Sequence, residues 1–135
     1  MREGWLDDVY VFVFDAEESA RFELDHGFAQ WLPGYSLRGL WNWCEFIVTE
    51  KPAGESMSLV CTVPLIAKYL EPLAVPVLTE PLEPDERWRG RIRWLRHPVI
   101  FGGKPKSGEY DEVDFATHAK LVRFWNKLYR EVKQI

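Results

Sequence analysis

The chain has 135 residues, of which 47% are hydrophobic and 15% aromatic, and its formal net charge is −4 at pH 7. This length and composition supply one core and are too small for two ordinary domains, so a single globular domain is expected over residues 1–135. The pI of about 5.4 argues against a nucleic-acid-binding protein. No apolar run approaches the roughly 20 residues of a membrane helix, so no membrane partner is expected.

The two cysteines, Cys44 and Cys61, are too few for a disulfide framework or a zinc cluster. The N-terminus lacks the basic region, apolar stretch and cleavage site of a secretory signal. We therefore expect a cytoplasmic protein with two reduced thiols. The sequence indicates neither a metal nor a cofactor.

Charge is divided unevenly along the chain. Residues 1–84 hold fourteen acidic and five basic side chains, a net charge of −9, whereas residues 85–135 hold seven acidic and twelve basic ones, a net charge of +5. Two interpretations are open: the two halves attract each other across the fold, or one of the two charged regions is a docking surface.

The first expected elements are a strand and a short helix. An unbroken run of β-branched and aromatic side chains from Val9 to Phe14 lies within residues 5–14 and predicts a central strand that is covered on both faces. Asp15 and Glu18 form a capping-box pattern, and Gly27 is a helix stop signal. These signals predict a helix over residues 16–26.

Residues 28–40 contain Pro33, Gly34 and Gly39 between large apolar side chains, which predicts an irregular connection held in place by its apolar residues. Residues 40–49 and 56–63 are expected to form a hairpin whose turn is residues 51–55. If the hairpin is centred near residue 53, the numbers of opposed residues add to about 105 or 106, which places Cys44 opposite Cys61 or a residue beside it.

The next segments are predicted to be short. Residues 64–70 are expected to make one or two helical turns, and residues 73–78 form an extended segment that Pro76 restricts to a sheet edge. Residues 79–86 are rich in proline and acidic residues and should be an exposed loop. Residues 89–96 alternate between arginine and smaller or apolar side chains, the period of a strand with one covered face.

The last twenty-two residues, 114–135, are predicted to form an amphipathic helix with Asp114 as its N-cap. Its apolar face should pack on the rest of the chain and consists of Leu121, Trp125, Leu128, Val132 and Ile135, widened by Phe124 and Tyr129. The opposite face is basic and consists of Lys120, Arg123, Lys127, Arg130 and Lys133. The whole pattern predicts an α+β fold in which a mostly antiparallel sheet of about five strands packs against this helix and one or two shorter helices.

Candidate catalytic residues are isolated. His118 is the histidine best placed for acid–base chemistry, although a lone histidine on an apolar helix face is typical of a packed core residue. The adjacent acidic pairs at residues 7–8 and 17–18 lack partners, because neighbouring residues on a strand point to opposite faces. The loop around Gly102 and Gly103, with its lysines, lacks the spacing of a phosphate-binding loop.

A surface rich in arginine and tryptophan is the best candidate for binding. Interleaved arginines and tryptophans suit phosphate or base contacts, but an arginine-bearing strand also prevents edge-to-edge pairing, and bunched tryptophans also build cores. The candidate interaction residues are Trp31, Tyr35, Trp41, Trp43, Trp88, Arg89, Arg91 and Arg93.

The sequence has no nucleophile motif, metal cluster or nucleotide-binding loop, but it has segregated charge and many aromatic residues. We therefore expect a small protein-interaction module that binds a protein partner by surface complementarity, such as an acidic inhibitor or an immunity protein. Enzymatic activity is less favoured. The alternative is a small-molecule-binding protein or an enzyme with a pocket near His118 and Tyr35.

Overall fold

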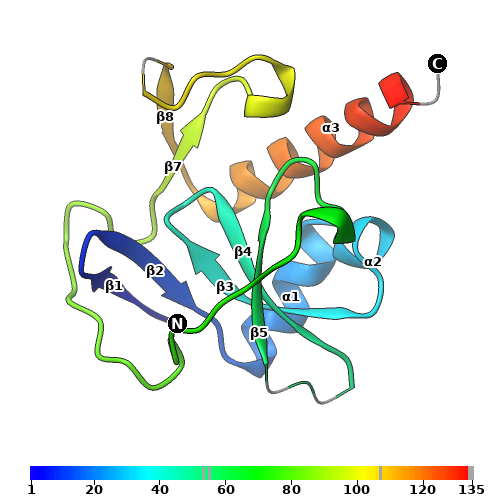
Figure 1. Cartoon of the computed structure of the whole chain (residues 1–135). Coiled ribbons are helices and arrows are strands. Elements are labelled where there is room, and N and C mark those ends of the chain that lie inside the picture. The colour runs from blue at the N-terminus through cyan, green and yellow to red at the C-terminus, as the bar shows by residue number, and fades with distance from the viewer. Residues whose placement is uncertain (53, 55, 107, 134–135) are drawn as a thin grey trace.

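The computed structural model describes residues 1–52, 54, 56–106 and 108–133. Six strands form an antiparallel sheet in which each strand pairs with the next one along the chain, and two later strands form a second, small sheet (Figure 1). The strands of the main sheet are β1 (Arg2–Leu6), β2 (Val9–Val13), β3 (Tyr35–Trp41), β4 (Glu45–Glu50), β5 (Met57–Cys61) and β6 (Glu71–Pro72). The small sheet pairs β7 (Ile92–Leu95) with β8 (Tyr110–Val113).

The α-helices are α1 (Ala16–Asp25), α2 (Phe28–Trp31) and α3 (Phe115–Lys133), and the 3-10 helices are η1 (Ala67–Tyr69) and η2 (Val99–Phe101). The fold is therefore α+β with a mostly antiparallel sheet and a long C-terminal helix, as the sequence predicts. Figure 1 shows α3 running between the region of η2 and the small sheet on one side and the main sheet with α1 and α2 on the other.

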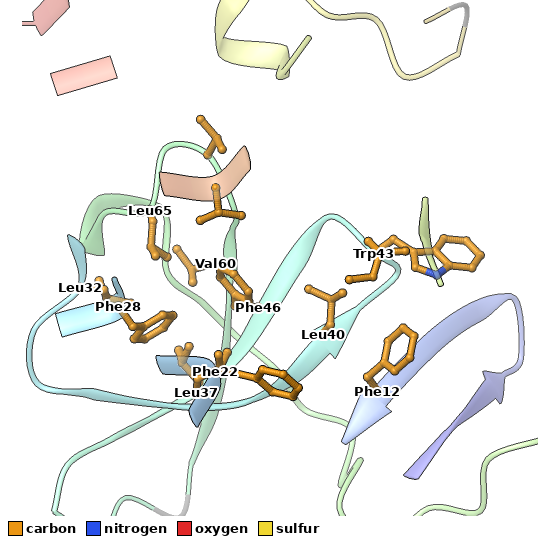
Figure 2. Packing of buried hydrophobic residues seen from close by; sticks show 14 of the residues in the cluster. Phe12, Phe22, Phe28, Leu32, Leu37, Leu40, Trp43, Phe46, Val60 and Leu65 are labelled. Carbon is orange, nitrogen blue, oxygen red and sulfur yellow. The ribbon is translucent and has the colours of Figure 1, made fainter. Parts of the chain in front are cut away.

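The main sheet is covered on both faces, which explains the apolar run in β2. Phe12 belongs to a large cluster of buried side chains under the helices, whereas its neighbour Val11 belongs to a second cluster. The second cluster includes Val77 and lies under the segment 73–82. Figure 2 shows that the large cluster extends from Trp43 at one end to Leu65 and Leu32 at the other.

The first predicted strand is a hairpin in the structure. Asp7 and Asp8 form a two-residue turn between β1 and β2, with Leu6 opposite Val9 and Asp7 at a φ of 55°. An aspartate tolerates this left-handed conformation, so the two acidic residues interrupt the apolar run. The prediction for α1 is correct: Asp15 and Glu18 make both hydrogen bonds of the capping box, and Gly27 follows the helix at a φ of 65°.

Residues 28–40 are more regular than predicted. They contain the single-turn helix α2 and most of β3, because their apolar side chains are buried in the large cluster. The hairpin register is confirmed, since Glu45 pairs with Cys61 and Thr49 with Met57, both adding to 106. Its predicted first strand is nevertheless divided between β3 and β4 by a turn at Asn42 and Trp43. Residues 53 and 55 of the predicted turn lie outside the described residues.

Residues 64–70 contain η1, as predicted, and residues 79–86 form a loop with one bridge between Glu83 and Trp5. Residues 73–78, however, form turns across the second face of the sheet, and the two residues of β6 provide the edge. The predicted strand over residues 89–96 is only β7. Its partner β8 was not predicted, because Tyr110–Val113 is acidic and half exposed.

The helix α3 begins after Asp114, whose carboxylate accepts a hydrogen bond from the Thr117 backbone N–H at 2.8 Å. Its most buried face differs from the predicted one. The fully or nearly fully buried residues are His118, Ala119, Val122, Asn126 and Tyr129. Leu121, Trp125 and Leu128 are only half-buried, Phe124 and Val132 are exposed, and Ile135 lies outside the described residues.

The difference follows from two buried polar side chains. Asn126 accepts a hydrogen bond from the Leu65 backbone N–H at 2.7 Å and donates to Thr62 O at 2.9 Å, so the polar position can face the core. Arg130, predicted on the basic face, is half-buried with its guanidinium 4.5 Å from the Trp31 ring centroid. A pattern based on hydrophobicity alone assigns both residues to solvent.

Candidate functional site

A pocket of about 320 Å³ lies between the two sheets and is called here the inter-sheet pocket. One wall comes from the main sheet, at residues 42–45 and 61–63, and the other comes from the small sheet and the segment that follows β7. Because Cys44 and Val99 are exposed, the pocket opens to solvent. Its lining residues are Asn42, Trp43, Cys44, Glu45, Cys61, Thr62, Val63, Arg93, Trp94, Leu95, Pro98, Val99, Pro105 and Tyr110.

The turn between β3 and β4 positions the main-sheet wall. Asn42 and Trp43 both adopt left-handed backbone conformations, with φ of 51° and 62°, and the Asn42 backbone N–H donates to Tyr10 O at 2.8 Å. The Trp43 ring stacks on Tyr10, with the ring centroids 5.3 Å apart and the planes 9° from parallel. Trp43 is thereby fixed at the edge of the large cluster and also lines the pocket.

The small sheet positions the opposite wall. Trp94 on β7 is buried and packs edge-on against His118 of α3, with ring centroids 5.4 Å apart. Arg93, the preceding residue, is exposed, and its guanidinium carbon lies 3.8 Å from the centroid of the Tyr110 ring. The Tyr110 hydroxyl donates to Pro105 O at 2.7 Å, which fixes that ring in turn.

Two thiols line the main-sheet wall, and both are free. Cys61 Sγ donates to Pro64 O at 3.1 Å. Burial of the sulfurs among protein atoms, followed by the negative charge of Glu45, raises the pKa of each thiol to about 11, although part of Cys44 is exposed. Both side chains are therefore neutral thiols near pH 7, which makes them weak nucleophiles and weak metal ligands.

Glu45 is the carboxylate of the pocket lining. Its pKa is raised, chiefly because burial penalises the ionised form and secondarily because Glu71 is nearby. The wall that carries the thiols is therefore weakly acidic, whereas the wall that carries Arg93 is basic.

Two indole N–H groups beside the pocket have no hydrogen-bond acceptor. The Nε1 atoms of Trp43 and Trp94 are both buried and unpartnered among the described residues. A buried donor without an acceptor costs free energy, so these positions favour an environment in which an aromatic ring, a water molecule or a ligand atom faces the N–H group.

His118 and Tyr35, the residues expected to flank a pocket, have different surroundings in the structure. His118 is completely buried in the core, and Tyr35 lies at the start of β3, where its hydroxyl is 3.5 Å from the Glu50 carboxylate. Neither residue lines the inter-sheet pocket. Tyr35 is the first residue of β3, whereas the pocket lies at the other end of this strand, beside the turn that begins with Asn42.

His118 belongs to a buried histidine pair. Nδ1 of His26 lies 2.8 Å from Phe22 O, so it carries the proton and donates, and Nε2 of His26 then accepts from Nδ1 of His118 at 2.9 Å. Burial lowers the pKa of both histidines, and for His118 the positive charge of protonated His26 adds to this effect. Both rings are thus neutral core residues, which agrees with the interpretation of His118 as a packed side chain.

The predicted aromatic surface is divided between separate parts of the fold. Trp43 and Trp88 are in contact, with ring centroids 4.7 Å apart. Trp31 is buried beneath Arg130 of α3, and Trp41 packs in the second cluster on the other face of the main sheet. Tyr35 is partly buried and packs against the large cluster. Among the five aromatic candidates, the ring contact that the described residues show is that of Trp43 with Trp88.

The predicted arginine surface has local carboxylate partners. Arg89 forms an ion pair with Glu86, and Arg91 with Glu112, while Arg93 stacks on Tyr110. Arg89 and Arg91 lie in the turn before β7, so the three side chains do not project from one strand. Their partners come from residues 85–135. The carboxylates that pair with Arg89 and Arg91 therefore do not belong to the acidic first part of the chain.

The other isolated candidates have structural roles. Asp7 and Asp8 form the β1–β2 turn, and Glu18 completes the cap of α1. The backbone N–H groups of Gly102 and Gly103 donate to Val99 O and Pro98 O. These two donors are consequently not available to a phosphate group.

Sequence reasoning missed the inter-sheet pocket, although it placed Cys44 beside Cys61. Because β8 was not predicted, the sequence did not indicate where the second wall of the pocket would lie. Within the described part of the chain, no group of three histidine, cysteine, aspartate or glutamate side chains is arranged to hold a metal ion. None of the helices built from described residues has the length and apolar composition needed to cross a membrane. No protein-family model, curated protein or solved structure matches the chain.

Proposed function

We propose that this chain is a binding protein that holds a small, largely apolar molecule in the inter-sheet pocket. The observation that carries the proposal is the pocket itself. Its volume of about 320 Å³ lies at the lower end of the range typical of small-molecule sites, roughly 300–1,000 Å³. Trp43, Trp94 and Leu95 give it an apolar lining with a few polar groups at the walls.

The chemistry of the lining favours binding over catalysis. The thiols of Cys44 and Cys61 have raised pKa values, and no described histidine lines the pocket to act as a base for them. A nucleophile and a neighbouring base are the minimum arrangement for covalent catalysis. Retention of a ligand needs only the apolar surface and a polar group to orient it.

A titration with the neutral probe 1-naphthamide tests this proposal. The indole N–H signals of the full-length, nitrogen-15-labelled protein are assigned by single tryptophan-to-phenylalanine replacements. We expect the signals of Trp43 and Trp94 to shift in a saturable way and that of Trp41 to stay unchanged, because Trp41 packs on the other face of the main sheet.

A second measurement uses the thiols. Bound probe should slow alkylation of Cys44 and Cys61, because both side chains line the pocket. Absence of a saturable shift up to the solubility limit of the probe, or equal shifts at Trp41 and Trp94, would overturn the proposal.

A second candidate function is binding of a protein partner, the activity that the sequence favours. The supporting observation is an apolar surface, called here the α3–η2 patch, in which Phe124 is 58% and Val99 61% exposed. Contacts from Phe124 to Trp125 and from Trp125 to Phe101, at ring-centroid distances of 5.3 and 5.1 Å, make it continuous. Exposed aromatic and aliphatic residues of this kind anchor protein interfaces.

Replacement of one residue tests the α3–η2 patch. Phe124→Ser should leave folding intact and abolish recovery of a defined partner by crosslinking, whereas Lys127→Ser, an exposed position one turn of the helix away, should retain it. Sedimentation velocity over a range of concentrations shows whether that partner is a second copy of this chain. Equal recovery by both variants would reject the patch as the interface.

A further inference from the structure

Arg93 is the exception among the arginines of residues 87–96. Arg87 and Arg91 pair with Glu112, and Arg89 pairs with Glu86. Arg96 pairs with Glu109 and Asp111. For Arg93 the described residues provide no carboxylate partner, and its guanidinium lies instead over the Tyr110 ring, in the lining of the inter-sheet pocket.

The strand register explains why Arg93 lacks a carboxylate. Arg93 on β7 is directly opposite Glu112 on β8, which would be its natural cross-strand partner. Glu112 pairs instead with two other arginines, with Arg87 through one carboxylate oxygen and with Arg91 through the other. Stacking on Tyr110 covers one face of the exposed Arg93 guanidinium, and the N–H edge can donate to an oxyanion.

We propose that the inter-sheet pocket binds a small apolar carboxylate, and that Arg93 pairs with its carboxylate group. This inference rests on the proposed binding function and specifies the ligand class. The apolar body of the ligand lies against Trp43, Trp94 and Val63, and its charged end lies at the wall formed by the small sheet.

Glu45 favours one orientation of the ligand in the pocket. It lines the main-sheet wall, opposite the wall that carries Arg93. A ligand carboxylate is repelled from the first wall and attracted to the second, so one orientation is favoured. The same arrangement disfavours a cationic ligand at the small-sheet wall.

Calorimetric titration of the full-length protein with 1-naphthoate and its neutral isostere 1-naphthamide tests the inference. The carboxylate should bind about ten- to a hundredfold more tightly than the amide, the range expected of a charge-assisted hydrogen bond. Arg93→Gln should abolish this preference, so that the two probes bind with similar affinities. Arg93→Lys should retain part of it, because lysine keeps the charge without the bidentate edge.

Two further variants complete the design. Arg89→Gln is the matched control: it removes an exposed arginine of the same segment that pairs with Glu86 rather than with Glu112, the residue opposite Arg93, and it should retain the preference. Glu45→Gln should increase the preference for naphthoate over naphthamide by about threefold, since it removes a like charge at the pocket. Unfolding curves of each variant confirm that it is folded.

The outcomes separate the two proposals. Failure of both probes to bind the parent protein would reject the pocket as a ligand site and this inference with it. Equal affinities for naphthoate and naphthamide, or a preference that survives in Arg93→Gln, would overturn the role of Arg93 while leaving the binding function standing.

Discussion

His118 and Cys61 show how the surroundings of a single residue decide its chemistry. Both residue types carry catalytic roles in other proteins, and here burial moves each pKa away from neutrality in the direction that favours the uncharged form. For a histidine this lowers the pKa, and for a thiol it raises it. The consequences are measurable as changes of stability and of reactivity with pH.

The histidine pair should make the protein less stable as the pH falls. Because the folded-state pKa of both His26 and His118 lies below the ordinary value of 6.5, the unfolded chain binds more protons below that pH. The free energy of unfolding should therefore be insensitive to these groups above about pH 7.5 and decrease from pH 6.5 downward, by at most about 1.4 kcal/mol per pH unit for each histidine.

Urea denaturation at pH 7.5, 6.5 and 5.5 measures this dependence. His118→Leu should lower stability at pH 7.5, because it leaves Nε2 of His26 without its donor, but should give a shallower decrease toward pH 5.5. Glu45 has a raised pKa, so its contribution to the free energy of unfolding changes with pH in the opposite direction. This contribution is the same in parent and variant and cancels when their free energies are subtracted. His97→Gln, at an exposed position, controls for the loss of a histidine. Identical slopes in parent and His118→Leu would contradict the assignment.

The two thiols should be alkylated slowly near pH 7, and their alkylation rate should still be rising at pH values where an ordinary thiol is already ionised. Alkylation by iodoacetamide without reductant should add two labels, and its rate should rise about tenfold per pH unit through pH 9 and 10, because both pKa values are about 11 rather than 9.0. Mass spectrometry measures both. A plateau near pH 9, or an unlabelled protein two hydrogens lighter, would be incompatible with free thiols of this kind.

Among the elements, α3 decides how the parts of the fold meet. It contacts α1 and β7, and Asn126 connects it to the backbone at Thr62 and Leu65, between β5 and η1. Arg130 extends the same connection by donating to Trp31 O and Leu65 O at 3.2 and 3.0 Å. The helix is thus fixed to the rest of the chain by buried hydrogen bonds as well as by apolar contact.

Asn126→Ala should therefore cost about 2–4 kcal/mol in the free energy of unfolding, because it leaves the Leu65 N–H and the Thr62 carbonyl buried without partners. Lys127→Ala, the next residue and exposed, should change it by less than about 0.5 kcal/mol. Chemical denaturation at pH 7.5 compares the two. A loss for Asn126→Ala as small as that for Lys127→Ala would mean that water replaces these hydrogen bonds.

At the scale of the whole molecule, the two sheets share one core. Ile92 and Trp94 of β7 are buried in the same cluster as Phe12 and Phe46 of the main sheet, and Val122 of α3 joins them. The small sheet consequently has little apolar surface of its own to support independent folding. This arrangement favours a single domain over residues 1–135.

A single cooperative unfolding transition is the expected result. Far-ultraviolet circular dichroism follows the sheets and helices, and tryptophan fluorescence follows the core. The two urea curves should coincide, because Ile92 and Trp94 of the small sheet are buried in the same cluster as the main sheet. An earlier transition that affects only the Trp94 indole signal would show that the small sheet unfolds separately and that the chain has two cooperative units.

Local signals in the sequence determined α1 and α3, their N-caps and the register of the β4–β5 hairpin. Asp15, Glu18, Gly27 and Asp114 act within a few residues of their own positions, so their effects can be predicted without knowledge of distant contacts. The period of the apolar residues likewise indicated the α+β class. These features depend on neighbours along the chain.

The face of α3 and the inter-sheet pocket depended on tertiary structure. Asn126 faces the core because the backbone near Leu65, 61 residues earlier, provides its partners, and no periodicity contains that information. Trp43 and Trp94 line one cavity only because β7 and β8 are held beside the β3–β4 turn, and Arg93 is left without a carboxylate only because Arg87 and Arg91 occupy Glu112. Contacts between residues far apart along the chain therefore decided both the candidate site and its charge.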